Sequence, residues 1–279
     1  MNVTGPDTRL LFCEGQPTSR DALLLDRLLI GRPGRLVISA GGKHGMRAFI
    51  DGYLQTYGTA PSYIAFRDRD FDSIPEAPVG LMRLKGEKPI FLSYRACLES
   101  YFVDAQLIDC YWNEGSAAAE WRHGTSPGIA DIRDWIEKAA REITAYQGVR
   151  WALAGLKPAE RWPELPTTWT KGSGFLPDSL TQETCLAEAK GLVAEYATES
   201  GRVSERRLLE EHQHYERQFA DPGFWDAGSY LVWFHGKDLL KAMQRLRPNS
   251  ISLANFCDWG VHRLNWQAHP DLKQLAEAI

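Results

Sequence analysis

Short apolar runs alternate with helical patterns from residue 9 to about residue 104. Leu10–Cys13, Leu36–Ser39 and Tyr63–Phe66 are each short enough to be one buried strand. A helix is expected after each of the first two runs, the first capped by Ser19 and the second starting near Met46. This βαβαβ order predicts an α/β fold with a mostly parallel sheet flanked by helices.

The pattern changes beyond this segment. A fourth apolar run at Pro89–Ser93 leads into Leu98–Phe102, and every tryptophan lies at or beyond Trp112. Two apolar stripes indicate helices: Ile129, Ile132, Ile136, Ala140 and Ile143, and then Leu208, His212, Tyr215 and Phe219. Lys157–Pro177 resembles a long surface loop, and a second α/β-like piece is expected at Tyr230–Phe234. We therefore expect three parts: 1–104, the first part of the core; 105–228, a mainly helical insertion; and 229–279, a C-terminal part that returns to the core.

Composition narrows the class of protein. Hydrophobic residues make up 44% and charged residues 24% of the chain, as in soluble globular proteins. The net charge of −4 neither indicates nor excludes a nucleic-acid partner. Met1–Arg9 lacks the apolar segment of a signal peptide, and no run approaches the roughly 20 apolar residues of a membrane span. The five scattered cysteines favour reduced thiols. We expect a cytoplasmic protein that does not cross a membrane.

Acidic side chains follow two of the predicted strands. Glu14 comes directly after the first strand, and Asp68, Asp70 and Asp72 follow the third. Ligands of open α/β sheets bind at strand ends. Carboxylates that converge there repel one another unless a cation, or protons, offset their charge. These residues therefore predict a divalent-metal site.

A nuclease would use such a site to cleave phosphodiester bonds. Mg²⁺, or Mn²⁺ in its place, is held by carboxylate oxygens, neutralises the charge of the transition state and generates hydroxide. Glu14 and Asp68 end neighbouring strands and can share a metal. Asp70 points the same way if the backbone is extended. Glu99 can complete a second metal, and Lys237 can stabilise the departing charge.

The order of these motifs resembles a TOPRIM domain of the OLD-nuclease type. The matching motifs are Glu14-Gly15 after the first strand, Asp68-x-Asp70 after the third, and Glu99 within Leu98–Phe102. More narrowly, the chain resembles the stand-alone TOPRIM effectors of PARIS-type anti-phage systems. The motifs that fit this subgroup are the Ser19-x-Asp21 helix start, Ala40-Gly41-Gly42-Lys43, and Asp68-Arg69-Asp70-Phe71-Asp72.

The resemblance implies a Mg²⁺-dependent endonuclease that acts as a toxic effector of anti-phage defence. It implies that Glu14 is the central ligand and general acid/base, that Asp68, Asp70 and Glu99 are ligands, and that Lys237 matches a late lysine by its Gly-Lys context. The chain has no Gly-x-x-x-x-Gly-Lys-Ser/Thr loop. The resemblance therefore places the ATPase, of the ABC type, on a separate chain that releases the effector when a phage is sensed. It favours tRNA over DNA as the substrate.

Several of these residues have simpler interpretations. Asp72 can cap the turn before Ile74, and Glu99 can be a carboxylate on a helix surface. Gly41-Gly42-Lys43 can bind a phosphate at a helix N-terminus or form a flexible turn. Zinc binding by the histidines is disfavoured because they lack cysteine partners; these are His123, His212 and His214. The tryptophans favour a core or an interface over base stacking.

Two other functions stay open. In the first, the protein is a non-catalytic module whose carboxylates bind metal structurally and whose tryptophan-rich part docks on an ATPase. In the second, it is a nucleotide-sugar transferase with a nucleotide-diphosphate pocket. A homodimer is also compatible with the sequence, because the tryptophan-rich half offers apolar surface.

Overall fold

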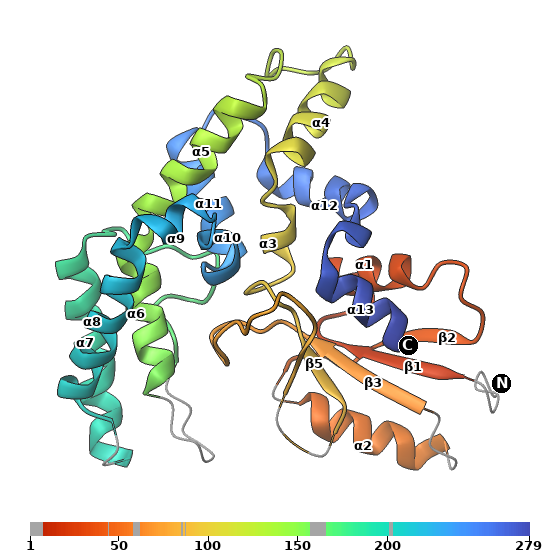
Figure 1. Cartoon of the computed structure of the whole chain (residues 1–279), viewed down its shortest axis with the longest axis horizontal. Coiled ribbons are helices and arrows are strands. Elements are labelled where there is room, and N and C mark those ends of the chain that lie inside the picture. The colour runs from red at the N-terminus through yellow and green to blue at the C-terminus, as the bar shows by residue number, and fades with distance from the viewer. Residues whose placement is uncertain are drawn as a thin grey trace. The chain divides into compact units, whose positions relative to one another are not determined.

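The computed structural model describes residues 8–43, 45–57, 62–84, 86, 88–156, 166–200 and 203–279. The chain divides into two units, coloured along the sequence in Figure 1. The first unit comprises the chain up to Arg69, Pro75–Leu98 and Ala254–Ile279. The second unit comprises Asp70–Ile74 and Glu99–Leu253. The chain thus leaves the first unit twice and returns to it for its last helices.

The first unit contains a sheet and its flanking helices. Its elements are β1 (Arg9–Cys13), α1 (Arg20–Leu28), β2 (Arg35–Ser39), α2 (Met46–Tyr57), β3 (Ser62–Arg67), β4 (Met82–Arg83), β5 (Ile90–Leu92), α12 (Leu253–Arg263), η1 (Trp266–Ala268) and α13 (Pro270–Ala278). The strands described here form a five-stranded sheet in the order β2-β1-β3-β5-β4, in which only β4 is antiparallel. The predicted α/β class and mostly parallel sheet are confirmed. The short strand β4 was not predicted.

β1 is an interior strand of the sheet and is covered on both faces. Leu10, Leu11, Phe12 and Cys13 are fully buried, as expected for a parallel strand covered on each side. Figure 1 shows α2 on one face of the sheet and α1 and α13 on the other. The ring of Phe12 makes edge-to-face contacts with Tyr53 of α2 and Tyr63 of β3. The strands β1, β2 and β3 and the helices α1 and α2 lie where the apolar pattern predicted them.

Hydrogen bonds tie α13 to the sheet. Arg9 Nη1 and Arg35 Nε donate to the main-chain oxygen of Ile279 at 3.1 and 2.9 Å. Both arginines thereby place positive charge at the C-terminal end of the helix, where the helix dipole favours it. Asp271, in the first turn of α13, accepts a hydrogen bond of 2.9 Å from the backbone N–H of Tyr94.

The second unit is helical in its described part. Its elements are α3 (Glu99–Phe102), α4 (Ala105–Ser116), α5 (Ile129–Glu142), α6 (Thr144–Gly155), α7 (Gln182–Ser200), α8 (Glu205–Ala220), α9 (Pro222–Asp226), α10 (Tyr230–Trp233) and α11 (Gly236–Leu246). Each residue of the predicted stripe on α8 is buried, namely Leu208, His212, Tyr215 and Phe219. Trp135 and Trp151 are also buried, so these two tryptophans belong to the core.

The second unit differs from the sequence prediction at Tyr230–Phe234. The α/β-like piece expected at Tyr230–Phe234 is wrong, because Tyr230–Trp233 is a short helix. An apolar run of this length does not distinguish a strand from a helical turn. The backbone N–H groups of Trp233 and Phe234 donate to the carbonyls of Ser229 and Tyr230, both at 3.0 Å, and so close a helical turn. Of the loop expected at Lys157–Pro177, residues 157–165 lie outside the described residues, and residues 166–177 contain neither helix nor strand.

Among the described residues, none of the helices combines the length and the hydropathy that crossing a bilayer requires.

Gly236, the first residue of α11, provides a test of packing inside the second unit. A Cβ at this position would lie 2.2 Å from the backbone nitrogen of Ser100. Because backbone cannot move aside cheaply, Gly236→Ala should lower the free energy of unfolding by at least about 2 kcal/mol in urea titrations. Gly191→Ala in α7 is the matched control. Its Cβ meets nothing within 4 Å, and the change should be neutral or stabilising by up to about 1 kcal/mol. Equal stability of the two variants would contradict this packing.

Candidate functional site

Glu14 and Asp68 follow the carboxyl ends of two adjacent parallel strands. Cys13, the last residue of β1, pairs in register with Phe66 of β3, so Glu14 and Asp68 both lie just beyond that pair. The strands β2 and β3 lie on opposite sides of β1, so the order of strands reverses here. This switch point is where open α/β sheets bind ligands. The structure therefore confirms that both carboxylates follow the ends of neighbouring strands.

A turn after β5 comes to the same strand end. The backbone N–H of Leu98 donates a hydrogen bond of 2.9 Å to Asp68 Oδ1. Arg69 is fully buried, and its Nε donates to the carbonyl of Tyr94 at 3.2 Å. Its backbone N–H donates to Ser93 Oγ at 3.1 Å. Asp68 and Arg69 thus hold both ends of the Ser93–Leu98 turn.

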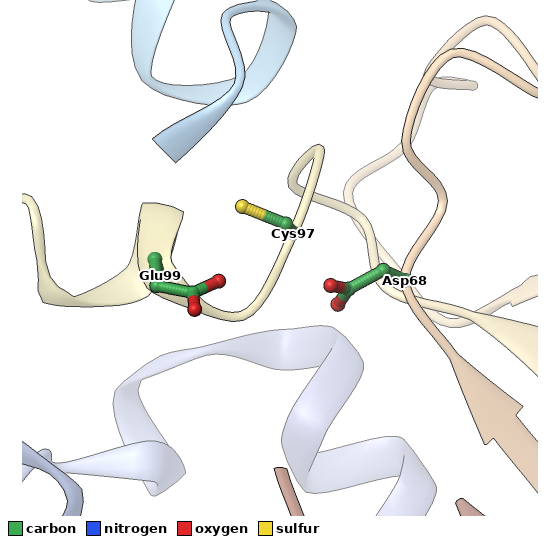
Figure 2. A group of neighbouring side chains, drawn as sticks. All are labelled: Asp68, Cys97 and Glu99. Atoms are coloured by element: carbon green, nitrogen blue, oxygen red, sulfur yellow. The ribbon is translucent and has the colours of Figure 1, made fainter. Parts of the chain in front are cut away.

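These hydrogen bonds collect a group that can hold a metal ion. Cys97 and Glu99 flank Leu98, so the Leu98–Asp68 hydrogen bond brings both of them to Asp68. One potential ligand atom from each residue lies within 4.8 Å of the others. Figure 2 shows the carboxylates of Asp68 and Glu99 turned toward each other, with the Cys97 side chain on the turn between them. Cys97 and Glu99 are buried and Asp68 is partly buried.

The strand end is also electrostatically negative. Burial, together with the carboxylates of Asp21, Asp26 and Glu14, raises the pKa of the Cys13 thiol to about 12, although the hydrogen bond with Ser39 opposes the shift. The Oε2 atom of Glu14 is itself buried. Negative charge that is gathered and partly shielded from water favours a bound cation. This electrostatic environment fits the donor set of the neighbouring Asp68 group.

The glycine loop after β2 lies beside Glu14. The backbone N–H of Gly15 donates to the carbonyl of Gly41 at 2.8 Å, and Gly41 returns a bond of 3.2 Å. Both glycines have positive φ, of 94° and 76°, which side chains disfavour. A Cβ at Gly41 or Gly42 would meet nothing within 4 Å, so a ligand can approach this backbone. Phosphate binding by Gly41, Gly42 and Lys43 stays a prediction.

Asp70 does not follow the predicted geometry. The extended backbone expected from Asp68 to Asp70 is wrong, because Asp70 has a φ of 49° in the left-handed region. Its Oδ1 lies 3.1 Å from Nε2 of the buried His235. Among the described residues, the metal-binding group contains Asp68 but none of Glu14, Asp70 and Asp72. The predicted ligand Glu99 belongs to the group, and Cys97 is a member that we did not predict.

Lys237 is placed next to Glu99. Its Nζ lies 3.6 Å from Glu99 Oε1. The close approach of Gly236 to the backbone of Ser100 allows the start of α11 to reach α3, which begins at Glu99. The lysine side chain is 44% exposed, whereas that of Glu99 is 10% exposed. A predicted catalytic lysine and a predicted ligand therefore form one ion pair.

A buried polar network holds the segment that carries Lys237. Asp238 is fully buried, and its Oδ2 accepts hydrogen bonds from Arg150 and from Gln147 Nε2, the latter at 2.8 Å. Its Oδ1 accepts from the backbone N–H of Gly174 at 2.9 Å. Gln147 Oε1 accepts from the backbone N–H of His235 at 3.1 Å. These contacts fix the start of α11 in a single orientation.

The network residues were not predicted from the sequence. Gln147 and Arg150 are polar positions within a helix whose neighbouring residues are buried, and this is the signal that could have found them. Asp238 directly follows Lys237, but nothing in its spacing indicates burial. Zinc binding by the histidines finds no support, because the metal-binding group of the described residues contains no histidine.

The charge of Asp238 gives a pH-dependent test. Burial alone would raise the pKa of this carboxyl, but Arg150 and His235, with hydrogen bonds from Gly174 and Gln147, bring it below its ordinary value of 3.8. Its stabilising contribution is therefore complete above about pH 4 and is lost as the pH falls further. Asp238→Asn should lower the free energy of unfolding by about 3 kcal/mol at neutral pH, because the charge of Arg150 stays buried.

The difference between wild type and Asp238→Asn should shrink toward about pH 3 in urea titrations. Asp134→Asn is the control, since this half-exposed residue pairs with Lys138 one helical turn away. It should change stability by less than about 0.5 kcal/mol. A difference for Asp238→Asn that stays constant with pH would contradict the assigned ion pair.

No protein-family model matches the chain, and a search of curated protein sequences found no match. The TOPRIM resemblance therefore rests on the residues of this chain alone, and it stays a prediction. The α/β class and a group able to hold a metal ion stand independently of it.

Proposed function

We propose that this protein is a metal-dependent nuclease with a TOPRIM-like core. The observation that carries the proposal is the pairing of the Asp68 and Glu99 carboxylates, with Cys97 beside them, at a strand end of a parallel sheet. Glu14 follows the adjacent strand. Carboxylates gathered at a switch point suit a cation that acts on a charged substrate.

The oxygens of this group fit a hard divalent ion. Asp68 and Glu99 would hold Mg²⁺ or Mn²⁺ through carboxylate oxygens, with water completing the shell. The bound ion would supply charge neutralisation at a phosphodiester and an activated water. Glu14, on the neighbouring strand end, would accept a proton from the attacking water. Asp70 would act through His235, its hydrogen-bond partner, rather than as a ligand.

Positive charge for the substrate is available near the carboxylates. Lys237 lies beside Glu99 and is half-exposed, so that its ammonium can turn from the carboxylate to a phosphate oxygen. The open backbone of Gly41 and Gly42 would bind a second phosphate through N–H groups. Each of these features, taken by itself, suits a polyanionic substrate. The resemblance adds tRNA in preference to DNA, a defence role, and control by an ATPase on another chain.

Cleavage assays test the proposal. The purified protein should cut RNA or DNA in the presence of Mg²⁺ or Mn²⁺ and not in EDTA. Asp68→Asn and Glu14→Gln should each lower the rate by about a hundredfold or more, because they remove a metal ligand and a proton acceptor. Asp51→Asn, an exposed acid paired with Lys88, should cut at the wild-type rate. Undiminished cleavage by Asp68→Asn, or no cleavage by wild type of any nucleic acid, would contradict the proposal.

Lys237 has a matched control on its own helix. Lys237→Ala should lower the cleavage rate by about tenfold to a hundredfold, because the charge beside Glu99 is lost. Lys241→Ala, one turn further along α11, should leave the rate unchanged. Single-turnover rates with bound substrate separate this effect from weaker binding. Equal rates for both alanine variants would show that Lys237 takes no part.

The thiol of Cys97 favours a second candidate function, a non-catalytic metal-binding module. Thiolates select ions such as Zn²⁺ and are poor ligands for Mg²⁺. If the protein is a Mg²⁺ nuclease, Cys97→Ser should keep cleavage within about threefold of wild type, because the carboxylates hold the ion. If it is a structural module, the wild type should bind Zn²⁺ tightly without cleaving nucleic acid, and Cys97→Ser should lose most of that affinity.

A further inference from the structure

A hollow lies wholly within the helical unit, between α5, α6, α8 and the start of α7. Its volume is about 360 Å³. The inner wall is formed by Gly148 of α6 and by His212 and Phe219 of α8, all of them buried. The rim carries exposed polar side chains, namely Arg141, Glu142, Gln182 and Glu216. An apolar base with a few polar groups at the rim is typical of a small-ligand site.

His212 is the polar group of the inner wall. Its side chain is only 3% exposed, and within the described residues its ring takes part in no hydrogen bond or ion pair. Buried imidazoles normally have a hydrogen-bond partner, so a ring that faces a hollow is suited to a ligand. Burial lowers the pKa of His212, although Glu216 opposes the shift. The neutral ring then offers one donor and one acceptor.

The rim carries two carboxylates that can accept hydrogen bonds, those of Glu142 and Glu216, and one cation, that of Arg141. Gln182 Nε2 donates to Glu216 Oε1 at 2.8 Å and so fixes this carboxylate at the edge of the hollow. The guanidinium of Arg141 stacks over the ring of Trp225, 4.1 Å from its centroid. Its Nε and Nη2 donate to Glu137 Oε1 at 2.9 and 2.6 Å, one helical turn away on α5. A second hollow of about 540 Å³ adjoins the first, since both include Arg141 and Phe219, and it extends to Trp225 and to the carboxylate of Asp226.

We propose that these adjoining hollows bind a nucleotide, with an amino-bearing nucleobase in the hollow at His212 and its phosphate at Arg141. A planar ring suits the space beside Phe219, and its exocyclic amino group can donate to Glu216 or Glu142. His212 pairs with a ring nitrogen or carbonyl of the base. The guanidinium of Arg141 lies over Trp225 and is oriented by Glu137, and its remaining N–H groups can donate to a phosphate. Adenine, cytosine and guanine carry the amino group and uracil does not.

Other ligand classes fit these residues less well. An inorganic anion would meet two carboxylates at the rim, and an apolar molecule would leave His212 without a hydrogen bond. An arginine side chain from a protein would suit the carboxylates but would face the cation of Arg141. The nucleotide is the ligand that uses the apolar wall, the acceptors and the cation together.

Gly148 makes the proposal testable without disturbing the fold. A Cβ at this position would lie 3.9 Å from the ring of Phe219 and 4.0 Å from Nε2 of His212, which is ordinary contact. Gly148→Ala therefore fits sterically and places a methyl group against the histidine. As a change within α6, it should also stabilise the helix by up to about 1 kcal/mol. Loss of ligand in this variant cannot be attributed to unfolding.

Titration calorimetry in EDTA, with the full chain, measures the binding. AMP, CMP, GMP, UMP and ribose 5-phosphate are the free probes, and single-stranded oligonucleotides of A, C or U test whether the base comes from a nucleic acid. We expect an amino-bearing nucleotide to bind wild type at least about tenfold more tightly than UMP or ribose 5-phosphate, a difference of about 1.4 kcal/mol. Gly148→Ala and His212→Phe should each weaken it by about tenfold or more.

The matched control is Gly191→Ala in α7, which makes the same chemical change in open space and should bind like wild type. Equal affinity for AMP, CMP, GMP and ribose 5-phosphate, or wild-type affinity in Gly148→Ala, would overturn the proposal. Binding of arginine amide in place of nucleotides would also overturn it and would indicate a protein partner. Because EDTA removes divalent ions and no residue of the metal group is altered, the outcome is independent of the proposed nuclease activity.

Discussion

The candidate centre depends on one hydrogen bond, from the backbone N–H of Leu98 to the carboxylate of Asp68. The parallel pairing of β5 with β3 brings the chain after β5 to the end of β3, and this hydrogen bond holds the turn against the carboxylate. With it, Cys97 and Glu99 come within reach of Asp68 from a segment thirty residues further along the chain. Buried Arg69 reinforces this arrangement by bonding to the carbonyl of Tyr94, in the same turn. The end of β3 and the Ser93–Leu98 turn thus bring together one group of potential metal ligands.

A buried network in the helical unit holds the backbone that carries Lys237. A lysine is useful beside a phosphate only if its backbone is held in place, and the fully buried Asp238 next to it provides this anchor. The partners of Asp238 are Arg150 and Gln147 from α6 and the backbone of Gly174. Burying such an ion pair contributes little net stability, but it penalises every arrangement in which one partner is unpaired. We infer that the network serves the orientation of residues 235–238 more than their stability.

The sequence permitted prediction of the parts that depend on local pattern. Leu10–Cys13 and Tyr63–Phe66 are apolar runs whose burial follows from their composition, so the strand ends and the acids after them could be located. The direction of the Asp70 side chain could not be predicted, because the pattern of apolar and polar residues does not indicate a left-handed backbone at a residue other than glycine. Cys97 joins the group through the Ser93–Leu98 turn, which Asp271 of α13 also holds through Tyr94. The hydrogen bond between Tyr94 and Asp271 joins residues that are 177 positions apart, so patterns among neighbouring residues could not predict it.

The proposed nuclease centre requires a divalent ion between the carboxylates of Asp68 and Glu99. The most direct measurement is anomalous X-ray scattering from crystals soaked in Mn²⁺. We predict a single strong peak about 2.1 Å from an oxygen of each of the two carboxylates, and no peak there in Asp68→Asn crystals. A map with no anomalous density at this position, or with Mn²⁺ bound only elsewhere, would contradict the proposed centre.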